Sequence, residues 1–447
     1  MKQSGQVLII SIIFMVVVLT LTGALLGFVG QNVIATRKAV ASEQAIQLAD
    51  AGIDKAIWQL NETAGAYTGE SGTVLGVTGV FDVAIANISG SVKEITATGY
   101  VPDKTNPRGT RQVKARVSID TTTVSFAYAV QVGPGGLSMA NISRINGNVF
   151  SSGTIDGANS ARISGDAYSA GASGRIQDMQ IDGTAWAHTI QNNTIGGNAK
   201  GYTLTSTTVG GSVYEYSISS CTVGGNASYT TKSSCTIGGN LYTPYAGESD
   251  PVAPAFPITD QQITDWKNVA EAGGIISGNY NMSGDDAATL GPKKIVGNLT
   301  LSNSAQLTLS GPLWVTGNIS LVNTTKIKLD SSYGGNSEVI IADGTFSTAN
   351  SAAFEGASGG SYIMMLTTSN SLNAINIANS AASLVAYAPY GTATMSNTAR
   401  LKEITANKLN MANSATLDYE TGLADINFTS GPGGSWAIVR GTWREVK

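Results

Sequence analysis

The sequence predicts a mainly β protein in which a long N-terminal helix and a small antiparallel sheet precede a right-handed parallel β-helix, or β-solenoid. Three observations lead to this fold class: an uncharged apolar run at 7–29, alternation of apolar and polar residues between 80 and 119, and short motifs that recur at fixed spacing beyond about 141. With 447 residues, 13% charged and 42% apolar, the chain is too apolar to be disordered and too long for one ordinary domain.

Residues 1–62 are expected to form a short leader and then one helix from about Gly5 to Asn61. The run 7–29 is about 34 Å long as a helix, which is enough to cross a bilayer core of about 30 Å and exceeds the apolar core of a cleavable secretory signal. After Arg37 and Lys38 the helical pattern continues, because apolar residues recur at spacings of three and four. This second stripe consists of Ile46, Ala49, Ile53, Ile57 and Leu60.

Residues 63–130 are expected to form the small sheet. Three short stretches alternate with period two, at 80–85, 95–101 and 112–117. The stretch 102–109, rich in Pro, Asn and Gly, is expected to turn the second strand back antiparallel to the third. So small a sheet needs an apolar partner for one face, and the helix stripe that ends at Leu60 supplies it.

Two segments carry a resemblance to a known family: SGQVLIISIIFMVVVLTLTG from position 4 and AIQLADAGIDKAIWQLN from position 45. They resemble type IV pilins, and in particular the PilX-like minor pilins and pilus assembly proteins, over residues 1 to about 120. The resemblance implies cleavage by a prepilin peptidase between Gly5 and Gln6. It also implies that the helix first spans the inner membrane and then packs against other pilins or minor pilins. The alternative is a plain signal anchor on an unrelated β protein.

The sequence departs from major pilins at one position. Ile10 stands where those proteins carry a glutamate five residues into the mature chain. The contact that this acid makes when subunits stack is therefore not carried over to this chain. The PilX-like branch often lacks the same acid, so the departure is compatible with the resemblance.

Residues 131–243 are expected to form the first solenoid array. A five-residue motif with a branched apolar residue, a central glycine and a second apolar residue recurs at spacings of 18, 18, 14, 14, 14 and 14. Each coil can then bury the branched residue of its neighbour. A calcium-binding β-roll would need aspartate after the paired glycines, where Asn or Ser stands here, and a β-sandwich gives no reason for fixed spacing. The branched residues are Ile145, Ile163, Ile181, Ile195, Val209, Val223 and Ile237.

Residues 276–447 are expected to form the second array and a C-terminal cap. Gly297-Asn-Leu-Thr-Leu returns as Gly317-Asn-Ile-Ser-Leu, and the segment from Trp436 to Trp443 is expected to close the last coil. Asparagines stacked at a corner can pass side-chain hydrogen bonds from coil to coil. We expect one β-helix of about a dozen coils, about 60 Å long. The stacked asparagines are Asn159, Asn303, Asn323, Asn350, Asn379, Asn397 and Asn413.

Residues 244–275 are expected to form a Pro-rich connector and a short helix. The connector contains Pro244, Pro251, Pro254 and Pro257. The segment 259–262 has a capping-box pattern, and Ile263, Trp266 and Val269 follow at helical spacing before paired glycines. This helix is expected to lie on the solenoid and to cover an edge.

The composition argues against catalysis and against a nucleic-acid partner. His188 is the single histidine, the two cysteines fit no zinc spacing, and the net charge is −4 with few basic residues between 121 and 250. The nearest acidic pairs are Asp178 with Asp182, Asp285 with Asp286 and Asp418 with Glu420, and none has companions that suggest a cleft. We therefore expect no enzyme, and no catalytic, cofactor-binding or metal-binding residues.

The two cysteines are separated by one coil. Cys221 and Cys235 are 14 positions apart, so they should lie on adjacent coils about 4.8 Å apart, within the Cα separation that disulfides tolerate. An oxidising compartment would favour a bond between them. Two small buried thiols are the alternative.

Aromatic residues recur five positions after the branched residue of five of the seven aligned coils. Two interpretations remain open: side-to-side stacking that stiffens the solenoid, or an exposed row that binds sugar faces or a protein partner. Lys200 and Ser228 occupy the other two coils. The candidate binding face consists of Phe150, Tyr168, Trp186, Tyr214 and Tyr242.

These observations lead to an expected function. The chain is expected to be a minor pilin-like structural protein of a type IV pilus, acting in pilus assembly or as an adhesin that displays its solenoid to a surface glycan or protein receptor. It should be a single-pass protein of the inner membrane first, and of the pilus, cell surface or periplasm afterwards. The alternatives are an envelope-tethered β-helix that binds or acts on polysaccharides, and a membrane-anchored scaffold with no pilus.

Overall fold

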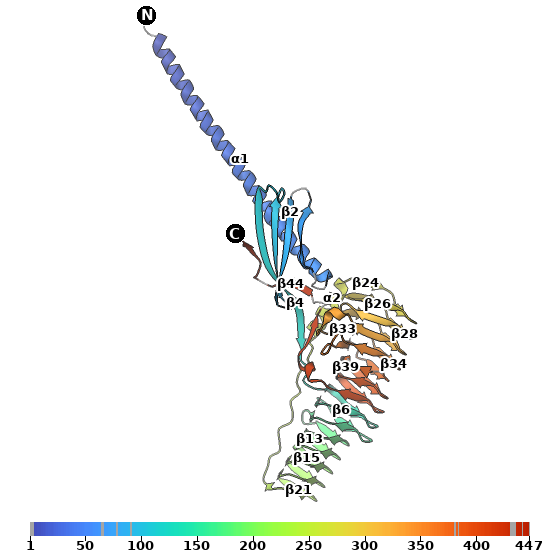
Figure 1. The fold of residues 1–447 in the computed structure, drawn as a ribbon. Helices are drawn as coiled ribbons and strands as arrows, with labels where there is room; N and C mark the ends of the chain where they lie inside the picture. The colour runs from blue at the N-terminus through green and yellow to red at the C-terminus, as the bar shows by residue number, and fades with distance from the viewer. Residues whose placement is uncertain are drawn as a thin grey trace. The chain divides into compact units, whose positions relative to one another are not determined.

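The computed structural model describes residues 4–63, 67–76, 79–89, 92–379, 381–382, 384–429, 435–439 and 441–446. The protein is mainly β with one long N-terminal helix (Figure 1). It forms two compact units. The head unit comprises Met1–Asp120 and Ser435–Lys447, and the solenoid unit comprises Thr121–Gly434.

The head unit contains the long helix α1, Ser4–Glu62, which is one continuous element of 59 residues. From Leu8 to Val40 its side chains are exposed, whereas from Ala41 onward one stripe is buried. The buried stripe is richer in small residues than the sequence analysis expected, and Ile46 and Ile57 lie only at its margin. Its fully or almost fully buried members are Ala41, Ala45, Leu48, Ala49, Ile53, Ala56 and Leu60.

Small residues on both partners let α1 lie close to the head sheet. A Cβ atom on Gly99 would lie 2.1 Å from the carbonyl oxygen of Ala45, and one on Gly109 would lie 2.4 Å from that of Ala41. No larger residue fits at these two positions without moving the helix. Phe81 and Ile95 fill the space on either side.

The head sheet is antiparallel. It has the order β1 (Gly69–Leu75), β2 (Gly79–Ser89), β3 (Val92–Val101) and β4 (Gly109–Val124). The predicted alternation gave β2, β3 and the first part of β4, but not β1. The predicted reversal between the second and third strands is confirmed, since Val101 pairs with Gly109.

The C-terminal segment does not close the last coil as the sequence analysis expected. Its strands β44 (Ser435–Ile438) and β45 (Arg444–Val446) pair antiparallel with β4 in the head sheet. The physical reason is that β4 offers an otherwise unpaired edge, and Trp436, which is 3% exposed, completes the apolar cluster between sheet and helix. Asn61 of α1 accepts a hydrogen bond from the backbone of Trp436 at 2.7 Å.

The solenoid unit is a stack of coils built from short parallel strands. Two of the three faces of the coil belong to one sheet of 24 strands, and the third face is formed by sheets of nine and five strands, counted over the described residues. The nine-stranded sheet contains β6 (Arg144–Asn146), β9 (Arg162–Ile163), β12 (Gln180–Ile181), β14 (Thr194–Ile195), β16 (Thr208–Val209), β19 (Thr222–Val223), β22 (Thr236–Ile237), β40 (Arg400–Leu401) and β42 (Thr416–Asp418). The five-stranded sheet contains β26 (Ala287–Leu290), β29 (Gln306–Leu309), β32 (Lys326–Leu329), β35 (Ala353–Glu355) and β38 (Ala381–Ala382).

The large sheet takes strands from both arrays. From the first array come β5 (Val130–Met139), β7 (Val149–Ser151), β8 (Ile155–Gly157), β10 (Ala167–Ser169), β11 (Arg175–Gln177), β13 (Ala185–Gln191), β15 (Ala199–Thr205), β17 (Val213–Tyr214), β18 (Ser217–Ser219), β20 (Ala227–Ser228), β21 (Thr231–Ser233) and β23 (Leu241–Tyr242). From the second come β24 (Ile275–Ser277), β25 (Tyr280–Met282), β27 (Lys293–Val296), β28 (Leu299–Ser302), β30 (Leu313–Val315), β31 (Ile319–Val322), β33 (Glu338–Ala342), β34 (Phe346–Ala349), β36 (Ile363–Thr367), β37 (Ile375–Ala378), β39 (Leu384–Ser396) and β41 (Glu403–Met411).

The repeat register predicted from the sequence is confirmed. Ile145 pairs with Ile163, Ile163 with Ile181, and Ile181 with Ile195, and the pairing continues through Val209 and Val223 to Ile237. All but Ile237 are at most 1% exposed. Each coil therefore buries the branched residue of its neighbour, as the spacing required.

The predicted asparagine ladder is also present. The amide of Asn159 donates to Asn141, and that of Asn141 donates to Asn413, both at 2.9 Å. In the second array Asn350 donates to Asn323 at 2.8 Å. These asparagines have φ between 50° and 71°, a left-handed conformation that asparagine tolerates better than most residues.

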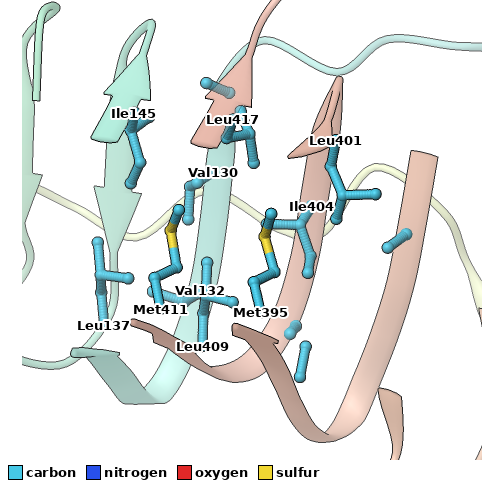
Figure 2. Close-up of a cluster of buried hydrophobic side chains, with 14 of the residues drawn as sticks. Val130, Val132, Leu137, Ile145, Met395, Leu401, Ile404, Leu409, Met411 and Leu417 are labelled. Carbon is cyan, nitrogen blue, oxygen red and sulfur yellow. The ribbon is translucent and has the colours of Figure 1, made fainter. Parts of the chain in front are cut away.

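The two arrays form one solenoid, but not in chain order. The last coil of the second array stacks on the first coil of the first array, since Ile404 pairs with Val130, Leu409 with Leu137, and Leu417 with Ile145. Figure 2 shows these side chains meeting in one core at the junction of the two arrays, and the single apolar cluster runs through both. The sequence analysis had placed the connector between the arrays. Instead, the connector returns along the outside of the first array to the opposite end of the stack (Figure 1).

The connector ends in the helix α2, Asp260–Ala272, and the predicted capping box of Thr259 and Gln262 is present. Ile263 and Trp266 are buried against β33 and β36, which are buried along their whole length. Strands covered on both sides become continuous apolar runs, which explains the sequences around Ile340 and Met364. The short strand β43 (Ile426–Thr429) and the 3₁₀ turns η1 (Ser331–Tyr333) and η2 (Thr421–Asp425) complete the unit, with β43 paired to the end of β4.

Candidate functional site

The acidic pairs considered from the sequence take part in structural contacts. Asp182 binds the guanidinium of Arg162 at 2.9 Å, and Asp286 accepts from the backbone of Ser283 at 2.8 Å. Glu420 binds Lys402 and the hydroxyl of Tyr362. Within the described residues, no group of three or more His, Cys, Asp or Glu side chains is placed to hold a metal ion.

The predicted aromatic row is a stack along one edge of the first array from Phe150 to Tyr214, and Ser228 separates Tyr242 from it. Phe150, Tyr168 and Trp186 are in register on β7, β10 and β13, with ring centroids 6.1 and 6.2 Å apart. Tyr128 extends the row before Phe150, at 5.4 Å. The sequence analysis missed Tyr128, because it precedes the first repeat.

Lys200 fills the gap in this row rather than interrupting it. Its ammonium lies 5.6 Å from the ring centre of Trp186 and 5.8 Å from that of Tyr214. Both rings therefore have a face occupied by a cation, an attraction of about 0.5–1 kcal/mol at exposed sites. The lysine that seemed to break the pattern in sequence continues the stack in space.

The row is not an open platform. Phe150 is buried, Tyr168, Trp186 and Tyr214 are half-buried, and Tyr242 is 51% exposed. Ring faces that contact one another or Lys200 are not free to stack on a sugar. This geometry favours the stiffening interpretation over the binding interpretation.

The connector also covers part of this edge. The indole of Trp186 donates to the carbonyl of Ser249 at 2.9 Å, and the side chain of Gln131 donates to that of Ala255 at 2.9 Å. The backbone of Glu248 donates to Gly201 at 2.9 Å. Sequence reasoning did not find this cover, because it follows from the order in which the arrays stack.

A second aromatic row lies beside the first and was missed. His188, Tyr202 and Tyr216 stack almost face to face, with centroids 5.2 and 4.8 Å apart and ring planes 10° and 8° apart. The signal was available, since these positions follow the same 14-residue period. His188 also contacts Asp250 of the connector, with Nδ1 3.0 Å from Oδ1.

A buried acid lies between these rows. Glu215 is fully buried, and neither carboxylate oxygen has a hydrogen-bond partner in the described part of the chain. Burial, and then the charge of Glu248 on the connector, raises the pKa of Glu215 well above its ordinary value. The protonated acid is therefore favoured, and the stability of this edge should depend on pH.

The two cysteines are joined in the structure. The sulfurs of Cys221 and Cys235 are 2.10 Å apart and the Cα atoms 4.4 Å apart, on adjacent coils. The bond links the last two coils of the first array. The sequence had left a disulfide and two free thiols as alternatives.

The predicted processing site lies at the start of α1. Gly5 and Gln6 fall within the helix, but their side chains are outside the described part of the chain, and cleavage between them stays a prediction. Among the described residues, α1 is the one helix that is long enough and apolar enough to cross a membrane. Its most apolar segment has no buried residue. Phe14 is 69% exposed and Leu26 66%.

These features define a class of protein with three parts: an apolar N-terminal helix, a small antiparallel head sheet, and a parallel β-solenoid that is inserted in the chain before the C-terminal strands of the head. No family model and no curated protein matches the sequence. Among solved structures the chain has a weak similarity to an ice binding protein from an Antarctic bacterium, Flavobacteriaceae, with 13% identity and a TM-score of 0.20. The match covers 65% of this chain and 80% of that one, and a TM-score this low supports no functional argument.

Proposed function

We propose that this chain is a minor pilin-like structural protein of a type IV pilus, which carries a solenoid on a pilin-like head. The observation that supports the proposal most strongly is the division of α1. Its first part is apolar and exposed on all sides, while its second part packs on the antiparallel head sheet through small residues. One helix thus serves two environments in succession.

The exposed half of α1 needs a cover. From Leu8 to Val29 it exposes large apolar side chains such as Phe14, Leu21 and Phe28. Burying one such side chain contributes about 1.5–3 kcal/mol, so a helix of this kind is unstable in water. A bilayer covers these apolar side chains before assembly, and the helices of other pilins cover them in a filament.

The solenoid is then the displayed part, in assembly or adhesion. Its long stack of parallel coils forms an extended platform, and two of the acidic side chains, Asp182 and Glu420, bind basic neighbours.

The decisive experiment is fractionation of surface filaments sheared from cells. The chain should be present in the filament fraction, and its N-terminus should begin at Gln6. Gly5→Val should keep the unprocessed chain in the inner membrane, whereas Gly30→Val, outside the processing site, serves as the matched control. Filaments free of the wild-type chain, with the chain retained in the membrane, would refute a structural role in the pilus.

A further inference from the structure

A basic hollow lies where α1 leaves the head unit. It has a volume of about 550 Å³ and is lined by Ile34, Arg37 and Lys38 of α1 and by Pro107 and Arg108 of the β3–β4 loop. A second hollow of about 330 Å³ adjoins it, and Arg37 and Arg108 line both. No acidic residue lines either hollow.

Among the described residues, the three cations of this hollow have no ionic partner. The ion pairs found within the described ranges do not include Arg37, Lys38 or Arg108. By contrast, Arg111 nearby binds Glu445 at 2.8 Å, and Lys104 in the same loop binds Asp82. The hollow therefore concentrates positive charge that no acidic side chain of the described residues pairs with.

The loop is held in place against the helix. The carboxylate of Asp103 accepts from the backbone of Thr105 and Asn106, both at 2.8 Å, so its charge is directed into the loop. The backbone of Arg108 donates to Val101 at 2.6 Å. Gly109, the next residue, lies against Ala41 with no room for a side chain. The loop is thus held beside Ala41, which lies about one helical turn after Arg37 on α1.

The position of the hollow along α1 indicates which layer of a membrane it would contact. The first charged residue after Lys2 is Arg37. A helix from 7 to 36 is about 45 Å long, close to the thickness of about 40–45 Å of a bilayer with its headgroups. If α1 spans a membrane, Arg37 and Lys38 lie at the headgroup layer, together with Arg108, which lines the same hollow. Ile34 lies about one helical turn before them, toward the apolar core.

We propose that this hollow binds the phosphate headgroups of anionic phospholipids in the bilayer that holds α1, and so fixes the head on the membrane before assembly. The inference rests on the proposed function in requiring α1 to span a membrane. Arginine suits such a role because its planar guanidinium binds phosphate through two donors. An acidic surface of a neighbouring pilin is the competing partner, and the experiment separates the two.

The test uses the full chain reconstituted in vesicles, with hydrogen exchange measured over residues 102–109. Exchange should be slower in phosphatidylcholine bilayers that contain phosphatidylglycerol than in pure phosphatidylcholine. One Lys or Arg near an anionic surface raises the binding constant about fivefold, so Arg108→Gln should reduce the protection of this loop against exchange by about the same factor. Raising the salt from about 0.05 M to about 1 M should abolish it. Lys93→Gln, at the other end of β3, is the matched control and should change nothing.

Two outcomes overturn the inference, and only one of them affects the proposed function. Equal exchange in the two bilayers refutes lipid binding, and if Arg108→Gln then also removes the chain from filaments, the hollow belongs to a pilin partner. A chain that alkaline carbonate strips from the vesicles has no spanning helix. That result refutes the membrane stage of the proposed function together with this inference.

Discussion

Replacing Leu409 and Leu137 by alanine, singly and together, should reveal a direct coupling between two residues that lie far apart in the chain. In the structure they are paired on adjacent coils across the junction of the two arrays, and they are 0% and 2% exposed. Each substitution removes a buried side chain from a packed core and should cost about 2–5 kcal/mol of unfolding free energy. Because the two side chains are neighbours in one core and their truncation would open a shared cavity, the free energy of unfolding of the double variant should deviate from additivity by about 0.5–3 kcal/mol.

The assay is urea unfolding of the four chains, with the free energies compared in a double-mutant cycle. Leu409 with Leu204 is the matched control, since Leu204 is five coils away, about 24 Å at the strand spacing, and should be additive within about 0.5 kcal/mol. If the arrays stacked in chain order, Leu409 and Leu137 would be distant too. Additivity for Leu409 with Leu137 would therefore refute the coil order described here.

Three further outcomes are expected. Lys232→Ile should cause end-to-end association when the chain is sedimented in detergent that covers α1, because Lys232 lies on an open strand edge at a position that is apolar in the preceding coils. Thr231→Ile, outside the core stack, should not associate, and a Lys232→Ile variant that does not associate would contradict this reasoning. Glu215→Gln should raise the melting temperature increasingly above that of the wild type as pH rises above about 4.5, because the unfolded wild type then ionises this acid while the raised pKa keeps it protonated in the folded chain. Parallel melting curves would argue against a buried proton. Reducing the bond between Cys221 and Cys235 should cost about 3 kcal/mol, as for other loops of this length, and two thiols that react freely in the unreduced, denatured chain would show that no bond exists.

The coils could be predicted from the sequence because their cause is local. A branched residue such as Ile195 or Val209 recurs at one point of every coil, since a stacked coil buries the same position each time. The asparagine corners and the capping box at Thr259 are likewise local patterns. Such features depend on residues that are near one another in the chain.

The arrangement of the arrays could not be predicted because it depends on distant pairings. Nothing in the repeat period specifies that Val130 pairs with Ile404, or that Trp436 returns to the helix that ends near Asn61. The order in which the arrays stack also determines how much of the aromatic row is exposed. Once the connector had to run back along the first array, part of the row was covered, and Trp186 became a hydrogen-bond donor to it.

The return of β44 and β45 to β4 has a consequence for synthesis. The helix α1 is made before the rest of the head described here, and it can enter a membrane while the solenoid is still being translated. The sheet beside it stays incomplete until β44 and β45 have been made, after the entire solenoid. A chain that stops early leaves the edge of β4 bare and lacks Trp436 in the core of the head. A complete head can therefore form only on a chain that has been translated through the solenoid. A partner that binds only the complete head would still select chains that carry the whole solenoid.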